Sequence, residues 1–337
     1  TQEWPLRPSY GGYNKETQKL YSKKKMAKSK VLIVGGTGFL GKRLVKASIE
    51  NGHDTYILQR PEIAADIDKI QILISFKMQG AHLVPASFND HQSLVDAVKL
   101  VDVVISAISG VYGRSHQILL QLKLVEAIKE SGNIKRFVPS EFGSDSSRMG
   151  EALEPGRITF DDKMVVRKAI EEAGIPFTYV VANCFACYFL AGLGQLFQFI
   201  PSTQSIVFLG DANQKAIFVN EDDIATYTIK TIDDPKTLNK TLHLRPPKNI
   251  LSQREIVQIW ENLIGKELQK STLSQQDFLA SIKEYRFEEQ VGLGHYYNVF
   301  YEGCLAKFEI GEDEEEASKL YPEVNYTTAE DYLKRYV

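Results

Sequence analysis

Three glycines at a spacing of three residues carry the strongest chemical signal in this chain of 337 residues. They are Gly35, Gly38 and Gly41, and they follow the apolar run Val31–Val34 directly. Glycines at such a turn let the backbone approach a pyrophosphate, and the next helix offers free N–H groups and the positive end of its dipole. Because the triplet stands between an expected strand and an expected helix, it predicts a dinucleotide-binding site. The predicted contacts in this loop also include Thr37, Phe39 and Leu40.

The next expected strand, Thr55–Leu58, is followed by residues that distinguish between the nicotinamide dinucleotides. An NAD site usually has Asp or Glu there, which accepts hydrogen bonds from the ribose 2′-hydroxyl. This chain has Arg60, whose guanidinium can pair with a 2′-phosphate through two hydrogen bonds. Lys69 follows nine residues later and can close the other side of that phosphate. The sequence therefore predicts NADPH as the cofactor.

Lys163 is the predicted catalytic residue, and it is also predicted to contact the cofactor. Short-chain reductases generally use a Tyr-x-x-x-Lys helix, and here Thr159 occupies the tyrosine position. A threonine hydroxyl is too weakly acidic to protonate a ketone at neutral pH, so ordinary carbonyl reduction is disfavoured. A lysine desolvated beside the nicotinamide has a lowered pKa and can act as general acid or base. Two alternatives stay open: Lys163 only orients the nicotinamide ribose, or it lies on an exposed helix surface.

Further candidates lie in loops and in the second half of the chain. Ser140 is predicted to hydrogen-bond the substrate or the nicotinamide carboxamide, and Phe142 to form a wall beside the ring; the neighbouring Glu141 has a structural alternative, pairing with a backbone group or a cation. For Phe185 and Tyr188, core packing is as good an explanation as substrate contact. The predicted substrate contacts are Val111, Tyr112, His116, Phe185, Tyr188 and His295.

These residues need elements that bring them together, and the chain alternates short apolar strands with amphipathic helices from Val31 to Val181. Such alternation predicts an α/β fold with a doubly wound parallel sheet of the Rossmann type. The expected strands are Val31–Val34, Thr55–Leu58, His82–Pro85, Val101–Ser106, Arg136–Pro139 and Phe177–Val181. The expected helices are Gly38–Glu50, Asp66–Gln79, His91–Lys99, His116–Glu130 and Phe160–Glu172. Ligands in such folds bind at the carboxyl ends of the strands, here 107–115 and 139–145.

Beyond Val181 the alternation loosens, which predicts a smaller α/β substrate-binding lobe over 182–337 after an NADPH-binding domain over 26–181. The lobe is expected to be interleaved with the sheet edge. Its expected strands are Ser205–Phe208, Ala216–Val219 and Thr241–Leu244, and its expected helices are Asp222–Thr231, Ser252–Leu263, Ser274–Ile282 and Phe287–Phe300. The acidic run Glu312–Glu316 is interpreted as a solvated helix start, with no metal site. Residues 1–25 are expected to be a disordered or artificially added extension.

The composition of the chain limits the kinds of binding partner and the cellular compartment that we expect. A net charge of −3 gives no reason to expect nucleic acid or an anionic membrane, and no apolar run is long enough to span a bilayer. Three cysteines are too few for a disulfide scaffold, so we expect a reducing compartment, the cytoplasm. Cys184 and Cys187 have the spacing of a redox pair, but they stand in an apolar aromatic run, which disfavours redox chemistry.

Several segments resemble the plant isoflavone reductase-like group of atypical short-chain reductases. They are Gly-Gly-Thr-Gly-Phe-Leu-Gly (35–41), Gln-Arg-Pro (59–61), Leu-Lys-Leu-Val-Glu-Ala-Ile-Lys-Glu (122–130), Lys-Arg-Phe-Val-Pro-Ser-Glu-Phe-Gly (135–143), Thr-Phe-x-x-Lys (159–163) and Leu-Tyr-Pro-Glu-Val-x-Tyr (320–326). The group contains pinoresinol–lariciresinol, phenylcoumaran benzylic ether and isoflavone reductases. Within it, residues 106–116 look most like the pinoresinol and pinoresinol–lariciresinol reductases.

The resemblance implies a reaction and a role for Lys163. The group's chemistry is NADPH-dependent cleavage of a benzylic ether in a furofuran lignan, in which the lysine takes the proton of the para-phenol and a quinone methide accepts hydride. It also implies a homodimer. The alternatives are reduction of an isoflavone or a phenylcoumaran and, from another class, a regulator that senses NADP without turnover and needs no basic residue at position 163. One reduction or two, and the preferred enantiomer, stay open.

Overall fold

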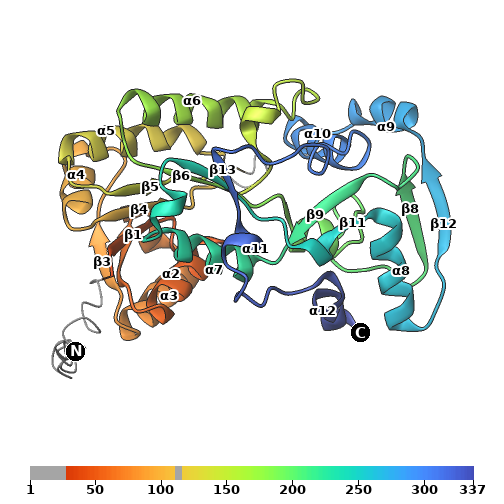
Figure 1. Cartoon of the computed structure of the whole chain (residues 1–337), viewed down its shortest axis with the longest axis horizontal. Helices are drawn as coiled ribbons and strands as arrows, with labels where there is room; N and C mark the ends of the chain where they lie inside the picture. The colour runs from red at the N-terminus through yellow and green to blue at the C-terminus, as the bar shows by residue number, and fades with distance from the viewer. Residues whose placement is uncertain (1–27, 111–115) are drawn as a thin grey trace, which may run out of the picture.

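A computed structural model of the chain describes residues 28–110 and 116–337 (Figure 1). The predicted contacts Val111 and Tyr112, and the predicted extension 1–25, lie outside the described residues. Figure 1 shows a larger sheet with helices on both faces, at the left, and a smaller lobe at the right. The predicted α/β fold class, a Rossmann-type sheet with a smaller C-terminal lobe, is confirmed.

Five parallel strands form the first part of the sheet, in the order β3-β2-β1-β4-β5. They are β1 (Lys30–Val34), β2 (Asp54–Gln59), β3 (His82–Pro85), β4 (Val103–Ser106) and β5 (Arg136–Val138). The strand order reverses between β1 and β4, which is where such sheets bind ligands. Each strand lies within two residues of its predicted bounds.

The sheet continues with strands from the second half of the chain. A bridge between Phe137 and Phe177 connects β5 to β6 (Thr178–Val181), and β6 pairs in parallel with β10 (Lys240–His243), which pairs with β13 (Glu314–Glu316). The chain thus returns to the sheet edge twice from the smaller lobe. The interpretation of the acidic run as a solvated helix start was wrong for its last three residues, because they pair as a strand. Only Glu316 acts on a helix: its carboxylate accepts the first N–H groups of α11 (Ala317–Leu320).

Alternation along β1 separates the two faces of the sheet. Val31 and Ile33 pack into one core cluster with α2, whereas Leu32 and Val34 pack into another with α4 and α5. This period of two is what a strand buried on both faces requires. On the first face lie α2 (Gly41–Glu50), α3 (Ile67–Met78) and α7 (Glu221–Thr231), and on the second lie α4 (His91–Lys99), α5 (Gln121–Ser131) and α6 (Ile158–Glu172) (Figure 1).

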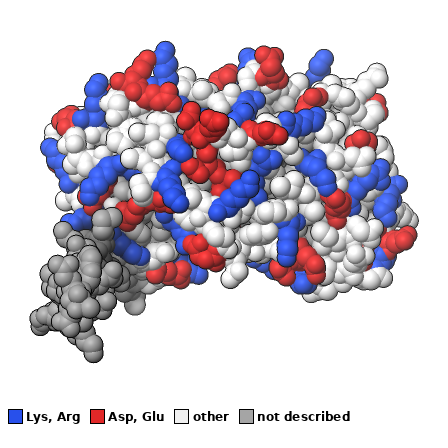
Figure 2. All heavy atoms as spheres, in the orientation of Figure 1, with Lys and Arg blue, Asp and Glu red and all other residues white. Residues whose placement is uncertain are grey.

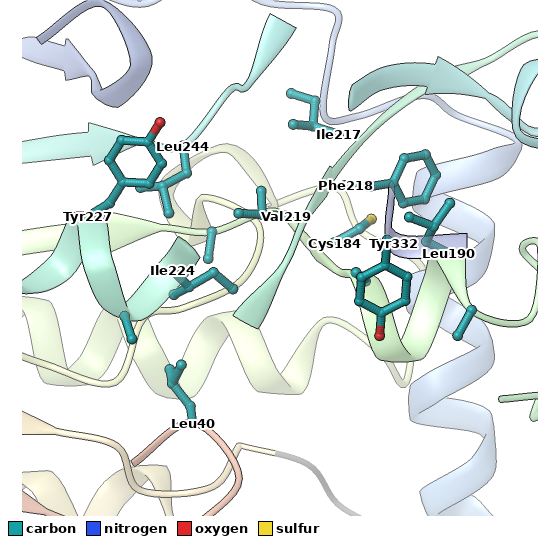
Figure 3. Packing of buried hydrophobic residues seen from close by; sticks show 14 of the residues in the cluster. Leu40, Cys184, Leu190, Ile217, Phe218, Val219, Ile224, Tyr227, Leu244 and Tyr332 are labelled. Atoms are coloured by element: carbon teal, nitrogen blue, oxygen red, sulfur yellow. The ribbon is translucent and has the colours of Figure 1, made fainter. Parts of the chain in front are cut away.

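The smaller lobe contains two short sheets, four α-helices and one π-helix. One sheet has the order β11-β9-β7 and the other pairs β12 with β8. The elements are β7 (Cys184–Phe185), the π-helix η5 (Ala186–Leu190), β8 (Ser205–Leu209), β9 (Lys215–Val219), β11 (Ile250–Ser252), α8 (Gln253–Ile264), β12 (Gln269–Leu273), α9 (Gln275–Ile282), α10 (Phe287–Phe300) and α12 (Ala329–Leu333). Figure 3 shows one apolar cluster that runs from Leu40 and Ile224 beside the large sheet to Phe218 and Tyr332 in the lobe. The two parts therefore share a core.

The surface has no strongly charged face in the view of Figure 2, where acidic and basic side chains are interspersed. Among the residues that the structure describes, no helix has both the length and the apolar character needed to cross a membrane.

Candidate active site

The glycine-rich loop packs so closely that larger residues cannot replace two of its glycines. Gly35 has a φ of +85°, and a Cβ there would lie 2.8 Å from the carbonyl oxygen of Ala107 at the end of β4. A Cβ at Gly41 would overlap the carbonyl oxygen of Gly35. The N–H of Gly38 donates to that same oxygen at 2.8 Å, which closes the turn. The loop therefore brings bare backbone to the carboxyl end of β1, as a pyrophosphate site requires.

Backbone N–H groups at the start of α2 are available to donate hydrogen bonds. Its first turn has no side-chain cap, and the N–H groups of Phe39 and Leu40 have no acceptor within the described ranges. Helix N-termini of this kind attract anions. Thr37 and Phe39 are half-buried in this loop, and Leu40 is buried beneath it. The ring of Phe39 lies between the guanidinium of Arg43, 4.3 Å from its centroid, and Tyr188, at 6.0 Å between centroids.

Arg60 and Lys69 lie where the sequence places them, after β2 and in the first turn of α3, but they differ in availability. The guanidinium of Arg60 donates to Gln117 Oε1 at 3.4 Å and has no acidic partner in the described part of the chain. The ammonium of Lys69 lies 2.5 Å from Oδ2 of Asp66, the residue that caps α3. Of these two cations, Arg60 is thus more available to bind a phosphate group.

Lys163 is buried, with 6% of its surface exposed, so the alternative of an exposed helix position is excluded. Its ammonium donates to the carbonyl oxygen of Glu141 at 2.5 Å, and a Cβ at Gly143 would lie 3.4 Å from it. Burial lowers the pKa of Lys163. Thr159, in the tyrosine position one turn earlier, is also buried, and its hydroxyl has no partner among the described residues. The structure thus provides a desolvated amine and no phenol beside it on this helix face.

The segment after β5 is tied to the segment after β4. The hydroxyl of Ser140 donates to the carbonyl oxygen of Ile108 at 2.7 Å, and its N–H donates to Oε1 of Gln121 at 2.7 Å. The proton of the Ser140 hydroxyl is therefore already used within the protein, and the oxygen can still accept a hydrogen bond. Phe142 is half-buried and packs against the core cluster that contains α2.

Two histidines predicted as substrate contacts are anchored to α6 or to the loop that leads into it. His116 Nε2 lies 2.5 Å from Oδ2 of Asp162, the residue before Lys163. His295, on α10, has Nε2 3.0 Å from the carbonyl oxygen of Gly156. Burial lowers the pKa of His295 to about 4, and the charge of Lys163 adds to the effect, so its ring is neutral at pH 7. A neutral ring that donates from Nε2 keeps an acceptor at Nδ1.

The aromatic candidates form a cluster at the start of the lobe. Phe185 and Tyr188 are stacked with 6.1 Å between ring centroids, and both keep part of their surface accessible. Tyr188 also contacts Phe39 of the glycine-rich loop and, edge-on at 6.3 Å, Phe199. Nearby Cys184 is buried, which raises the pKa of its thiol well above the usual value. The structure therefore brings the lobe's aromatic residues to the dinucleotide loop.

Sequence reasoning missed a buried network of charges behind Lys163. Arg167, one turn further along α6, contacts the carboxylates of Glu141 at 2.6 Å and Asp145 at 3.1 Å. One signal in the sequence was the spacing of four between two basic residues, which places them on one helix face. The other was Glu141, whose structural alternative, pairing with a cation, is confirmed by its contact with Arg167. Arg148 extends the network from Asp145 to Glu314 of β13.

Asp145, His243 and Glu314 bring ligand-type atoms within 4.8 Å of one another. Arg148 contacts both carboxylates, at 3.1 Å and 2.8 Å, and its charge opposes the binding of a cation there. The cluster is therefore an ion-pair junction between the sheet edge and the site.

Comparisons with known proteins agree with this geometry. The model of the family described as NmrA-like matches residues 27–333. The bifunctional pinoresinol-lariciresinol reductase of Forsythia intermedia is 72% identical over 313 residues, 93% of this chain and 100% of that protein. Its namesake from Linum album is 71% identical over 309 residues, 92% of this chain and 94% of that protein. A solved structure described as AtPrR2 with NADP+ and (+)pinoresinol has a TM-score of 0.90 at 58% identity, over 92% of this chain and 99% of that one. The predicted resemblance is confirmed, and the chain belongs to the NmrA-like family.

Proposed function

We propose that this chain is an NADPH-dependent oxidoreductase that opens a benzylic ether of a furofuran lignan, converting pinoresinol to lariciresinol. Relatives at 71% and 72% identity are named for that reaction, and a solved relative holds NADP+ and (+)pinoresinol. The observation in this chain that carries the proposal is the buried amine of Lys163 at the carboxyl end of β5. Product analysis decides whether the enzyme also carries out a second reduction, from lariciresinol to secoisolariciresinol.

The residues present fit NADPH. Bare backbone at Gly35, Gly38 and Gly41 and the uncapped start of α2 suit its pyrophosphate, and Arg60 suits its 2′-phosphate. We assign the cofactor to 26–181 and the substrate to 182–337, with Phe185, Tyr188 and His295 as contacts from the lobe and His116 from the loop after β4.

The chemistry follows from the protonation state of Lys163. Because burial favours its neutral form, its amine can accept the proton of the substrate's para-phenol. The resulting phenolate expels the benzylic oxygen as an alkoxide, which takes up a proton from water, and the substrate becomes a quinone methide. Lys163 returns its proton to the phenolate once the ring is aromatic again. NADPH, when bound, supplies the hydride that the benzylic carbon accepts, which restores the aromatic ring. The net addition is one hydride and one proton, and no ketone is protonated, so Thr159 in the tyrosine position is compatible with the reaction.

The test is turnover of racemic pinoresinol with NADPH, followed by chiral chromatography, for the wild type and Lys163→Ala. We expect lariciresinol or secoisolariciresinol from the wild type, and loss of product with retained NADPH binding from the variant. Turnover of a phenylcoumaran or an isoflavone instead would reassign the substrate. If NADPH binds and none of the three classes reacts, the chain is better explained as a regulator that senses NADP.

We also propose that the enzyme is a cytoplasmic homodimer. The family resemblance supports the dimer, and three free cysteines and a requirement for NADPH suit a reducing compartment. Light scattering coupled to size-exclusion chromatography tests the dimer, and a fluorescent fusion tests the compartment.

A further inference from the structure

Glu141 contacts both buried basic side chains of α6, Lys163 and Arg167. Its carbonyl oxygen accepts the hydrogen bond of Lys163, and its carboxylate accepts that of Arg167 at 2.6 Å. The two basic residues are four apart, so they lie on one face of the helix. One residue of the segment after β5 therefore contacts two side chains of α6, one through its backbone and one through its carboxylate.

Arg167 has no contact with solvent that could replace these partners. The exposed fractions of the Arg167, Glu141 and Asp145 side chains are 5%, 2% and 2%. The guanidinium also lies over the ring of Tyr179, 4.4 Å from its centroid. Two carboxylates and an aromatic face therefore hold the buried guanidinium.

The charges around Lys163 oppose one another. Burial lowers its pKa most strongly, Glu141 and Asp145 raise it, and Arg167 lowers it. Every element packed against the amine contributes a titratable or charged group. These are Asp162 and Arg167 on α6, Glu141 and Asp145 after β5, His295 on α10, His116 before α5 and, beyond Asp145, Arg148. Without Arg167, Glu141 and Asp145 would still act on the amine, and the positive charge that opposes them would be gone.

We propose that Arg167 is a positioning residue for the reaction: through Glu141 it orients the carbonyl group that holds Lys163, and its charge keeps the amine available as a base. The inference rests on the proposed function. This role differs from that of an ordinary stabilising ion pair. An ordinary ion pair would contribute to the free energy of folding without changing the protonation of Lys163.

The experiment records kcat/KM for pinoresinol against pH, whose acidic limb reports the essential base of the free enzyme. In Arg167→Met the limb should move to higher pH by about one unit or more, so that activity below the limb falls roughly tenfold. In Glu141→Gln it should move to lower pH. The double variant removes both charges, and its limb should return toward that of the wild type. Opposite shifts of this kind cannot arise from loss of stability alone.

Two further variants separate charge from geometry. Arg167→Lys keeps the charge and loses the planar fork, so kcat should fall with little movement of the limb. Lys168→Met removes a positive charge from the exposed side of the same helix, where Lys168 lies 3.8 Å from Glu172, and should leave the profile unchanged. Coincident limbs in the wild type and both single charge variants, with only the melting temperature lowered, would reduce Arg167 to a structural role.

A second measurement does not depend on turnover. The pKa of Lys163 can be followed by ¹³C NMR of protein labelled at lysine Cε, with the resonance assigned from Lys163→Ala. Arg167→Met should raise this pKa and Glu141→Gln should lower it, whatever the substrate. If NMR shows these pKa shifts but no lignan is turned over, the role of Arg167 is supported and the proposed function is rejected. If a lignan is turned over but the pKa shifts are absent, the proposed function is supported and the role of Arg167 is rejected.

Discussion

Gly156 and Gly294 lie against each other where α10 crosses the start of α6, and a Cβ at Gly294 would stand 3.0 Å from the α-carbon of Gly156. A methyl group there must displace the backbone of the loop that leads into α6, which also contacts it through the Leu153 carbonyl oxygen at 3.0 Å. We expect His295 beside it to lose its 3.0 Å contact with the Gly156 carbonyl oxygen. We expect Gly294→Ala to reduce the free energy of unfolding by about 1–3 kcal/mol. Chemical denaturation measures the loss, and KM for pinoresinol should rise with it.

Gly292→Ala is the matched control on the same helix, two residues away. A Cβ at Gly292 meets no atom within 4 Å, and the backbone there is helical. Alanine should therefore stabilise the protein by about 0.5–1 kcal/mol, because it lowers the entropy of the unfolded chain. Equal stabilisation of both variants would show that helix propensity dominates and that the close contact at Gly294 costs nothing.

Arg60 and Lys69 should differ in their effect on cofactor choice. Among the residues that the structure describes, Gln117 is the hydrogen-bond partner that the Arg60 guanidinium would have to leave, whereas Lys69 already pairs with Asp66 at 2.5 Å. We expect Arg60→Ala to weaken NADPH binding by roughly tenfold to a hundredfold, since a hydrogen bond to a charged group contributes about 1.5–3 kcal/mol. Lys69→Ala should cost clearly less. Fluorescence titration with NADPH and NADH provides the comparison, and equal losses for the two cofactors would contradict the assignment.

The sequence predicted the local features of the site well. The strand before Gly35, the helix after it and the position of Lys163 on α6 all follow from short-range patterns, namely apolar runs, a glycine triplet and a basic residue at a fixed place. Such patterns extend over a few neighbouring residues, so they can be recognised in a single sequence. Arg60, the basic residue after β2, was predicted from a short-range pattern in the same way.

The charge network could not be predicted in the same way. Glu141 and Arg167 are 26 residues apart, and Arg148 and Glu314 are 166 apart, so nothing in the local pattern pairs them. The acidic run also misled, because a charged segment is normally solvated, whereas Glu314 here lies on the edge strand β13, pairs with β10 and contacts Arg148. Tertiary contacts reverse local preferences at these positions.

Two buried histidines should make the protein less stable in mild acid. Burial lowers the pKa of His243 and brings that of His295 to about 4, while in the unfolded chain a histidine titrates near 6.5. As pH falls below about 6.5, the unfolded chain takes up protons that the folded protein does not, so the free energy of unfolding decreases until the pH reaches the folded values. The slope is up to about 1.4 kcal/mol per pH unit for each histidine.

The comparison of variants isolates this effect from that of other groups, such as Asp223, whose pKa burial raises to about 6. Urea unfolding between pH 4 and pH 7 should give a shallower slope for His295→Asn than for the wild type. His91→Asn, which changes an exposed histidine on α4, serves as the control for the substitution itself. An unchanged slope in His295→Asn would mean that His295 is protonated in the folded state.

His116 and Asp162 should be energetically coupled, because their facing atoms are 2.5 Å apart and their side chains are only 13% and 19% exposed. A hydrogen-bonded pair this sheltered is expected to show a coupling free energy of about 1–3 kcal/mol in a double-mutant cycle. The cycle uses His116→Asn, Asp162→Asn and the double variant, with stability and KM as readouts. If the pair anchors the loop after β4 to the helix that carries Lys163, KM should rise similarly in the two single variants and rise no further in the double one. Additive effects on KM would show that each residue acts separately, with His116 contacting the substrate by itself.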